Sequence, residues 1–95
     1  SLSAMTGAAA RCTDLRLVHL EDIAPHYAMT LATWRNRFLE NLDAVARLGY
    51  PPEFQRLWLY YLHYCEAGFS ERYLGTLQLL FQKPRCALAP VLGAV

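Results

Sequence analysis

Two long stretches of the chain repeat their apolar residues with the spacing of a helix. The first runs from about Pro25 to Leu48, and the second begins at Pro51-Pro52. In both, apolar residues return after three or four positions, so they share one face of an amphipathic helix. They are Tyr27, Leu31, Trp34, Phe38, Leu42 and Val45 in the first stretch, and Phe54, Trp58, Tyr61, Cys65 and Phe69 in the second. We therefore predict two amphipathic helices, the first of which ends at Gly49.

Polar residues fill the positions between the apolar ones of the first helix. We expect them to lie mainly on its solvent side; they are Arg35, Arg37, Glu40, Asn41 and Asp43. Pro25 suits the first turn of a helix, because the amide hydrogen that proline lacks is not needed there. Asp22 precedes this turn, and we expect it to cap the helix or to favour its positive end.

Three further segments have shorter patterns. Leu2–Cys12 is rich in small, helix-compatible residues, so it predicts a short helix with Ser1 or Ser3 as its cap. LRLVHL, residues Leu15–Leu20, predicts a mostly buried strand that ends at Glu21-Asp22. YLGTLQLLF, residues Tyr73–Phe81, is apolar on both faces and predicts a central strand of a sheet.

The predicted order is thus helix, strand, helix, helix, strand, followed by a loose tail over residues 85–95. Residues 1–84 are taken as one folded portion. Two strands are too few for a stable sheet, and a strand that is apolar on both faces needs neighbours on both edges. The sequence therefore predicts an α/β fold in which the other strands of the sheet lie outside this chain.

Composition places the chain among globular domains. It has 95 residues, of which 55% are hydrophobic, and a formal net charge of +1. A domain of this length buries only about 60–65% of the surface that its unfolded chain exposes, so we expect a partner to cover the apolar excess. The charged residues are dispersed and form no basic stripe, which argues against nucleic-acid binding.

Cysteine number and the pattern of the first residues bear on the cellular compartment. Three widely spaced cysteines fit reduced thiols in a cytoplasmic protein better than a disulfide framework. No apolar run is long enough to span a bilayer, and SLSAMTGAAARC lacks the pattern of a signal peptide. Because the chain opens on Ser1, we expect that an upstream part of the protein is missing from it.

Most of the polar candidates for chemistry have a simple structural interpretation. No GxGxxG motif is present, and His63 and Cys65 are two residues apart, which is the wrong spacing for two metal ligands on one helix. We therefore predict neither a metal site nor a cofactor-binding loop. His26 as a base for a nucleophilic Cys65 stays an alternative to a cysteine that only packs in the core. The acids Glu21, Asp22 and Glu66 fit helix caps and surface charges.

Aromatic residues are dense in LWLYYLHYCEAGF. Such a stretch normally belongs to a core, but aromatic side chains on two helices can also line a pocket for a long apolar ligand. The spacing alone does not choose between these two interpretations.

The motifs around these helices resemble those of a known family. The matching residues are His26-Tyr27, Thr30-Leu31, Trp34, Phe38, Tyr61-Leu62, Cys65, Phe69 and the run from Gln78 to Pro84. In this order and spacing they resemble the C-terminal part of the cyclopropane-fatty-acid synthases, which include the mycolic-acid cyclopropane synthases and use S-adenosylmethionine. The resemblance covers residues 1 to about 84.

The resemblance implies the C-terminal part of a class I, Rossmann-like methyltransferase fold. It also implies transfer of a methyl group from S-adenosylmethionine to an alkene carbon of a fatty-acyl chain, after which bicarbonate removes a proton and the ring closes. Tyr27 falls on a family tyrosine whose hydroxyl holds the bicarbonate. Cys65 falls on a family cysteine near the acyl pocket. The further residues expected to line or support this pocket are Leu31, Trp34, Tyr61 and Phe69.

The chain also departs from the family pattern. Ala24 and Met29 replace residues that are often glycine and a charged residue, which bears on loop shape and substrate choice. The glycine-rich cofactor loop and the upstream bicarbonate contacts are missing, so we expect the isolated 95 residues to bind no cofactor and to be inactive. The expected partners are the missing N-terminal half, unsaturated phospholipid acyl chains at a membrane surface and, as a further candidate, a second copy of the chain.

Three alternatives to cyclopropane synthesis stay open at this point. A relative with the same fold could methylate an acyl chain without closing a ring, or methylate an amine. A free-standing helical module could use its aromatic stripes to bind a partner helix. The sequence does not determine the acyl length or the double-bond position.

Overall fold

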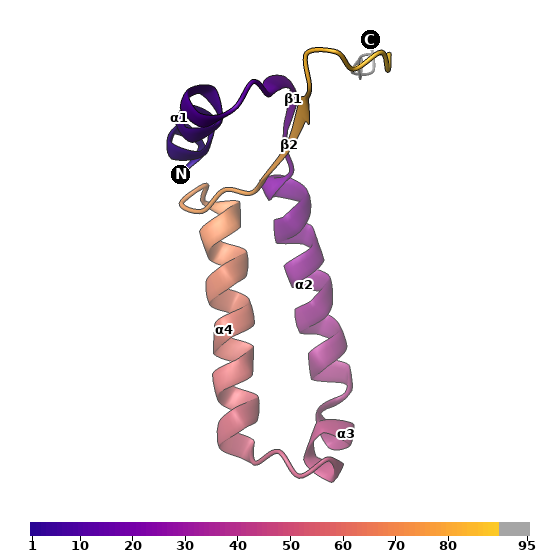
Figure 1. Cartoon of the computed structure of the whole chain (residues 1–95). Helices are drawn as coiled ribbons and strands as arrows, with labels where there is room; N and C mark the ends of the chain where they lie inside the picture. The colour runs from indigo at the N-terminus through magenta and orange to yellow at the C-terminus, as the bar shows by residue number, and fades with distance from the viewer. Residues whose placement is uncertain (90–95) are drawn as a thin grey trace. The chain divides into compact units, whose positions relative to one another are not determined.

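A computed structural model describes residues 1–89 and resolves two compact units (Figure 1). One unit contains Ser1–Glu21 together with the segment that starts at Leu77, and the other contains Asp22–Thr76. Residues 85–89 form neither helix nor strand, and the rest of the tail predicted over 85–95 lies outside the described residues. No helix within residues 1–89 is long and apolar enough to cross a membrane.

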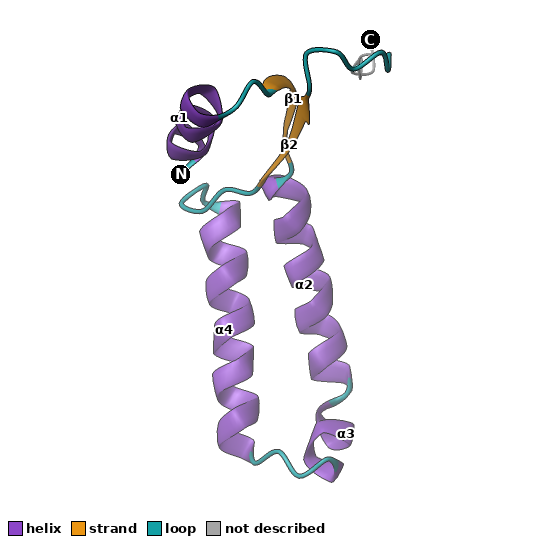
Figure 2. Cartoon of the chain, in the orientation of Figure 1, coloured by secondary structure: helices purple, strands orange, loops and turns teal. Residues whose placement is uncertain are grey.

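The first unit contains the helix α1 (Leu2–Cys12) and two strands, β1 (Arg16–Asp22, of which the last residue belongs to the other unit) and β2 (Leu77–Gln82). The bounds predicted for α1 are confirmed, and the Ser1 hydroxyl accepts a hydrogen bond of 3.3 Å from the Ala4 amide as a helix cap. The two strands pair with each other as an antiparallel ladder (Figure 2). The described residues thus form a mixed helix and strand structure.

Both strands differ in their limits from the sequence prediction. β1 continues through Glu21 and Asp22 instead of ending there. β2 begins four residues later than predicted, because the residues before it fold back on the preceding helix: the Leu74 amide donates to the Gly68 carbonyl at 2.9 Å. The prediction that the first strand is mostly buried is wrong within this chain, since Leu17 and Leu20 are each 41% exposed.

The second unit is a helical hairpin made of α2 (Ala24–Glu40), α3 (Leu42–Arg47) and α4 (Pro52–Ser70). α2 and α4 pack against each other along their length and run in opposite directions (Figure 1). The residues buried in this seam are Ala24, Ala28, Leu31 and Leu62. Alanines in the seam let the two backbones approach closely, so the hairpin is held by a narrow core.

The single helix predicted from Pro25 to Leu48 is wrong: the helix breaks at Asn41 into α2 and α3. In a continuous helix the Asn41 amide would donate to the Arg37 carbonyl. Here the Asn41 side-chain amide occupies that carbonyl at 2.7 Å, and the backbone amide turns to Phe38 at 3.1 Å. This local competition by asparagine ends the helical ladder.

The end of α3 follows the prediction. Gly49 adopts φ of 95°, a left-handed conformation that favours glycine, and its amide donates to the Ala46 carbonyl at 3.0 Å. The chain then enters α4 through Pro51 and Pro52, and Pro52 is the first helical residue.

Candidate functional site

A cavity of about 400 Å³ lies along the seam between α2 and α4. We call it the aromatic groove. The residues that line it are Tyr27, Leu31, Trp34, Arg37, Phe38, Trp58, Tyr61 and Leu62. Six of these eight belong to the two stripes predicted from the sequence, so the groove is the surface at which the apolar stripes of the two helices meet.

Helix periodicity explains which residues form the floor of the groove and which form its walls. Leu31 is 2% exposed and Leu62 is 4% exposed, so both belong to the buried seam. Trp34 and Tyr61 are 46% and 48% exposed. Their rings therefore stand beside the seam and leave an apolar surface open between them.

Tyr27 lies at the end of the groove near the start of α2. Its ring makes edge-to-face contacts with Phe69, at 4.7 Å between ring centroids, and with Trp34, at 6.1 Å. Within residues 1–89 the Tyr27 hydroxyl has no hydrogen-bond partner, and it is not among the side-chain atoms sealed from solvent. The ring is held by packing while the hydroxyl stays available to a ligand.

Tyr61 and Cys65 lie one helical turn apart on α4. The pKa of Tyr61 is raised, chiefly because its hydroxyl interacts with the Cys65 sulfur. Negative charge on Cys65, burial and negative charge on Tyr27 act in the same direction. Cys65 and Tyr27 are therefore close enough to Tyr61 to raise its pKa, and polar side-chain tips gather at this end of the groove.

Aromatic rings continue along α4 away from that end. Tyr50 stacks on Phe54 with 4.5 Å between ring centroids, and Phe54 stacks on Trp58 at 5.9 Å. Trp58 in turn packs on Tyr61 at 4.9 Å. The apolar surface thus extends without interruption from Tyr61 to the loop before α4.

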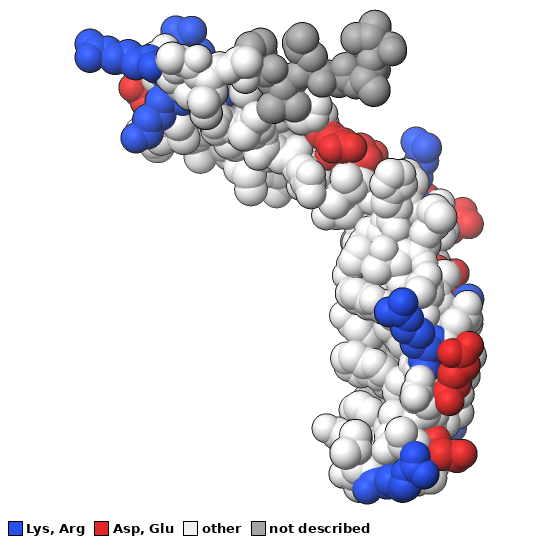
Figure 3. Space-filling view, turned by 90° about the vertical axis from the view of Figure 1, so that its right-hand side faces the viewer, with Lys and Arg blue, Asp and Glu red and all other residues white. Residues whose placement is uncertain are grey.

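An ion pair between the two helices lies on the other side of the seam. Arg35 of α2 forms an ion pair with Glu66 of α4, with 2.5 Å between Nη1 and Oε2, and the same Nη1 lies 3.4 Å from Nδ1 of His63. The two paired side chains are only 22% and 23% exposed. The predictions that Arg35 lies on the solvent side and that Glu66 is a surface charge are therefore wrong, because each gains a partner from the opposing helix. Figure 3 shows the charged side chains of the helical part gathered toward one edge, beside a large uncharged surface.

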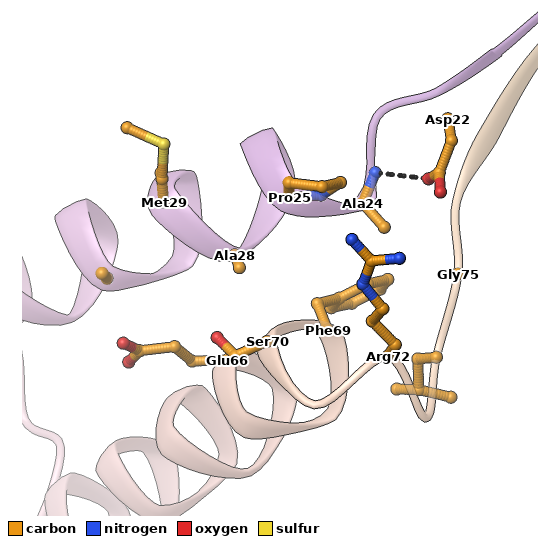
Figure 4. A pocket seen from close by; sticks show the side chains of 12 residues that line it. Asp22, Ala24, Pro25, Ala28, Met29, Glu66, Phe69, Ser70, Arg72 and Gly75 are labelled. Atoms are coloured by element: carbon orange, nitrogen blue, oxygen red, sulfur yellow. Dashed lines mark hydrogen bonds between the residues drawn. The ribbon is translucent and has the colours of Figure 1, made fainter.

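A second cavity, of about 470 Å³, lies at the base of the hairpin (Figure 4). Its lining includes Ala28, Glu66, Phe69 and Arg72, and Arg72 extends from the turn after α4 toward the start of α2. Asp22 caps α2 as predicted, since its Oδ1 accepts from the Ala24 amide at 3.0 Å. The side chains around this cavity serve helix ends and the ion pair, so we assign no chemistry to it.

Of the residues expected at a site, the structure brings Tyr27, Leu31, Trp34 and Tyr61 into the aromatic groove. Cys65 is half-buried beside Tyr61, and Phe69 supports the Tyr27 ring while it lines the second cavity. The four other residues of the groove were not predicted at the site: Trp58, Phe38, Leu62 and Arg37. The apolar stripes already contained the first two, whereas nothing in the sequence indicated that Arg37 lines an apolar groove.

The side chains that could bind a metal are dispersed over the described part of the chain. Within residues 1–89 no three side chains of His, Cys, Asp or Glu come together. His26 is exposed and makes no side-chain hydrogen bond to Cys65 in this part of the chain. Gly49 and Gly75, the glycines outside helices in this range, lie apart in different loops, so they do not form one glycine-rich loop.

Comparison with known proteins adds to this geometry. The family model for mycolic acid cyclopropane synthetase matches residues 1–79. The chain is 47% identical over 66 residues, or 70% of its length, to the tuberculostearic acid methyltransferase UfaA1 of Mycobacterium tuberculosis, and 33% identical over 70 residues, or 74% of its length, to a probable fatty acid methyltransferase of Pseudomonas putida. These matches span 16% and 18% of the two relatives. No solved structure matches the chain.

Proposed function

Because the chain belongs to the mycolic acid cyclopropane synthetase family, we propose that it works as one segment of an S-adenosylmethionine-dependent methyltransferase that modifies the double bond of an unsaturated fatty-acyl chain. The observation that carries the proposal is the groove itself. An open apolar surface between two helices ends at an available tyrosine hydroxyl, Tyr27, next to Tyr61 and Cys65.

This arrangement suits a long hydrocarbon with one reacting point. The walls formed by Trp34 and Tyr61 give an acyl chain apolar contact on the side that faces this chain. The polar tips at one end fix the place where the reaction occurs. We propose that the Tyr27 hydroxyl donates a hydrogen bond to a bicarbonate ion, which is the base of the reaction, while the contacts with Phe69 and Trp34 hold the ring.

The chain supplies only part of such an enzyme. We propose that S-adenosylmethionine binds mainly to the part of the relatives that this chain does not span, because no glycine-rich cofactor motif occurs in the sequence. In the proposed class I methyltransferase fold, α1 is the last crossover helix, β1 and β2 are the sixth and seventh strands, and the hairpin from α2 to α4 is an insertion. Residues 1–84 form this portion of the domain, and the exposed apolar faces of β1 and β2 then pack against its remaining elements.

Cyclopropane formation remains our first assignment, and methylation without ring closure is the alternative. The name of the tuberculostearic acid relative favours that alternative for part of the family. Methylation of an amine and a helical interaction module have no comparable support. We propose unsaturated phospholipids as the source of the acyl chain and a cytoplasmic location at the membrane surface for the enzyme.

The test uses a complete methyltransferase that carries this segment. Replacing Tyr27 with phenylalanine removes the hydroxyl and keeps the ring contacts, so we expect turnover to fall by about 100-fold or more with little change in the melting temperature. Tyr60→Phe is the matched control, because Tyr60 is 66% exposed and lies outside the groove. Equal turnover of the Tyr27→Phe variant and the parent enzyme would refute the role of Tyr27. Mass spectrometry of the product separates a cyclopropane from a methyl branch.

A further inference from the structure

Arg37 is the charged residue that lines the aromatic groove. It belongs to the last turn of α2, and it makes no ion pair within residues 1–89. The other arginine of this helix end, Arg35, is neutralised by Glu66 on the far side of the seam. The groove therefore combines an apolar lining with one cation that lacks a protein partner in this range.

The antiparallel packing of the helices sets the order of residues along the groove. Tyr27 contacts Phe69 at one end of the hairpin. Toward the other end, the Gln55 side chain donates to the Leu42 carbonyl at 3.4 Å. Between these contacts, Trp34 comes after Tyr27 along α2. Arg37 lies farther along α2, toward the end of the groove that Trp58 of α4 lines. The groove thus has a cationic end and a hydroxyl end.

The separation of these two ends matches the length of an acyl chain. Tyr27 and Arg37 are ten residues apart on one helix, which corresponds to about 15 Å at about 1.5 Å per residue. One leaflet of a bilayer has a hydrocarbon thickness of about 15 Å, half of the full core. An acyl chain with its headgroup at Arg37 therefore reaches Tyr27 with carbons far from its carboxyl end.

We propose that Arg37 binds the phosphate of a phospholipid and that the groove holds the acyl chain, so that the distance from headgroup to Tyr27 selects which carbons react. The guanidinium suits this task because it remains charged and can donate two parallel hydrogen bonds to a phosphate. A favourable interaction of Arg37 with the helix dipole also fits its position in the last turn. Stabilising the helix end would not make the groove prefer anionic lipids, whereas binding a phosphate would. A comparison of charged and uncharged lipids therefore separates these two roles of Arg37. The inference rests on the proposed function, because it concerns the same acyl chain.

The tryptophans of the chain provide a direct measurement. The sequence contains two, Trp34 and Trp58, and both line the groove. Their fluorescence is followed while the chain is titrated with oleoyl lysophosphatidic acid, which has one acyl chain and a phosphate, with oleic acid, which has a carboxylate, and with monooleoylglycerol, which is uncharged. All lipids are kept below the concentration at which they form micelles.

We expect oleoyl lysophosphatidic acid to bind about 10-fold more tightly than monooleoylglycerol, as one charge-assisted contact at an open rim allows. Arg37→Gln should remove this 10-fold preference without weakening the uncharged lipid. Arg56→Gln is the matched control, since this exposed arginine of α4 lies outside the groove, and it should preserve the preference. Oleic acid that binds as tightly as the phosphate lipid would overturn the assignment of Arg37 to phosphate.

Brominated acyl chains, which quench tryptophan at short range, test the direction of the chain. With bromine near the headgroup, the Trp34→Phe variant, which retains Trp58, should be quenched more strongly than Trp58→Phe. With bromine at mid-chain this order should reverse. The same order for both lipids would overturn the inference.

Failure of this inference is distinguishable from failure of the proposed function. Equal binding of charged and uncharged lipids, together with loss of turnover in Tyr27→Phe, would remove only the role of Arg37. Absence of quenching by every brominated lipid would remove acyl binding by this chain, and with it the inference. A tryptophan signal that responds to protein dilution but not to lipid would show that a second copy fills the groove, which would also overturn it.

Discussion

The ion pair between Arg35 and Glu66 is a direct link between the two long helices, and its removal should loosen the hairpin. Both partners are about one-fifth exposed, and the donor–acceptor distance is 2.5 Å. Fully exposed pairs contribute about 0.2–1 kcal/mol, and hydrogen bonds to charged groups contribute about 1.5–3 kcal/mol. Partial burial places this pair between those cases, so we expect a coupling free energy of about 1–2 kcal/mol.

A double-mutant cycle measures this coupling without counting lost packing. Glu66→Gln keeps the size of the side chain, and Arg35→Met keeps most of its apolar stem. The free energy of unfolding is determined by urea denaturation for the parent chain, the two single variants and the double variant. Because Arg35 also contacts His63, each single substitution has its own cost, but only the shared interaction appears in the coupling term.

Salt provides an independent check of the electrostatic origin. Raising the ionic strength should reduce the coupling free energy only in part, because contact pairs that are partly shielded from water are screened less than exposed ones. A coupling free energy below about 0.3 kcal/mol would refute the reasoning, since that is within the range of independent sites. It would mean that hydrophobic packing alone joins the two helices.

Two further predictions concern the loop after α3 and the groove. Gly49→Ala should lower the free energy of unfolding by about 1–2 kcal/mol, measured by urea denaturation, because φ is 95° and no neighbouring atom lies within 4 Å of the added Cβ, so the cost comes from the backbone alone; an unchanged midpoint would contradict this. The raised pKa of Tyr61 favours the neutral hydroxyl in the folded state, so its contribution to stability is fully present below about pH 10 and is lost as the pH rises through the higher folded pKa. Ultraviolet titration of the parent and of Tyr61→Phe should identify one tyrosine that ionises above the ordinary range, and Cys65→Ala should lower its pKa toward about 10.

Local periodicity was sufficient to predict the two long helices α2 and α4, apart from where α2 ends. The apolar spacing predicts one helix from Tyr27 to Phe38 and another from Phe54 to Phe69. The structure has a helix over each of these ranges. The break at Asn41 was missed because a periodic pattern does not show that a side chain competes for a backbone carbonyl. The late start of β2 was missed for a related reason, since the Leu74 amide turns back to Gly68 in a contact with the preceding helix.

The candidate site could be predicted from the sequence only for those residues that lie on one face of a single helix. Tyr27, Leu31 and Trp34 share a stripe and therefore meet in the groove. The sequence could not show that Arg35 pairs with Glu66, because that contact depends on how α2 and α4 align. Arg37 is exposed as predicted, but the sequence did not indicate that it also lines the groove. Whether a residue at the edge of a stripe faces solvent or lines the groove depends on which residues of the opposing helix lie beside it.

The ion pair on one side of the hairpin and the aromatic groove on the other both depend on how α2 aligns with α4. Ala28, Ala32 and Arg35 follow the groove residues Tyr27, Leu31 and Trp34 by one position, so they point about 100° away around α2. Arg35 thus links α2 to α4 on one side, and the groove opens on the other. A variant that breaks this link should therefore change the spacing between Tyr27 and Tyr61, although neither residue touches the ion pair. The pKa of Tyr61 depends in part on Tyr27, so it would report such a change. An unchanged pKa of Tyr61 in the Glu66→Gln variant would show that the small residues of the seam hold the alignment by themselves.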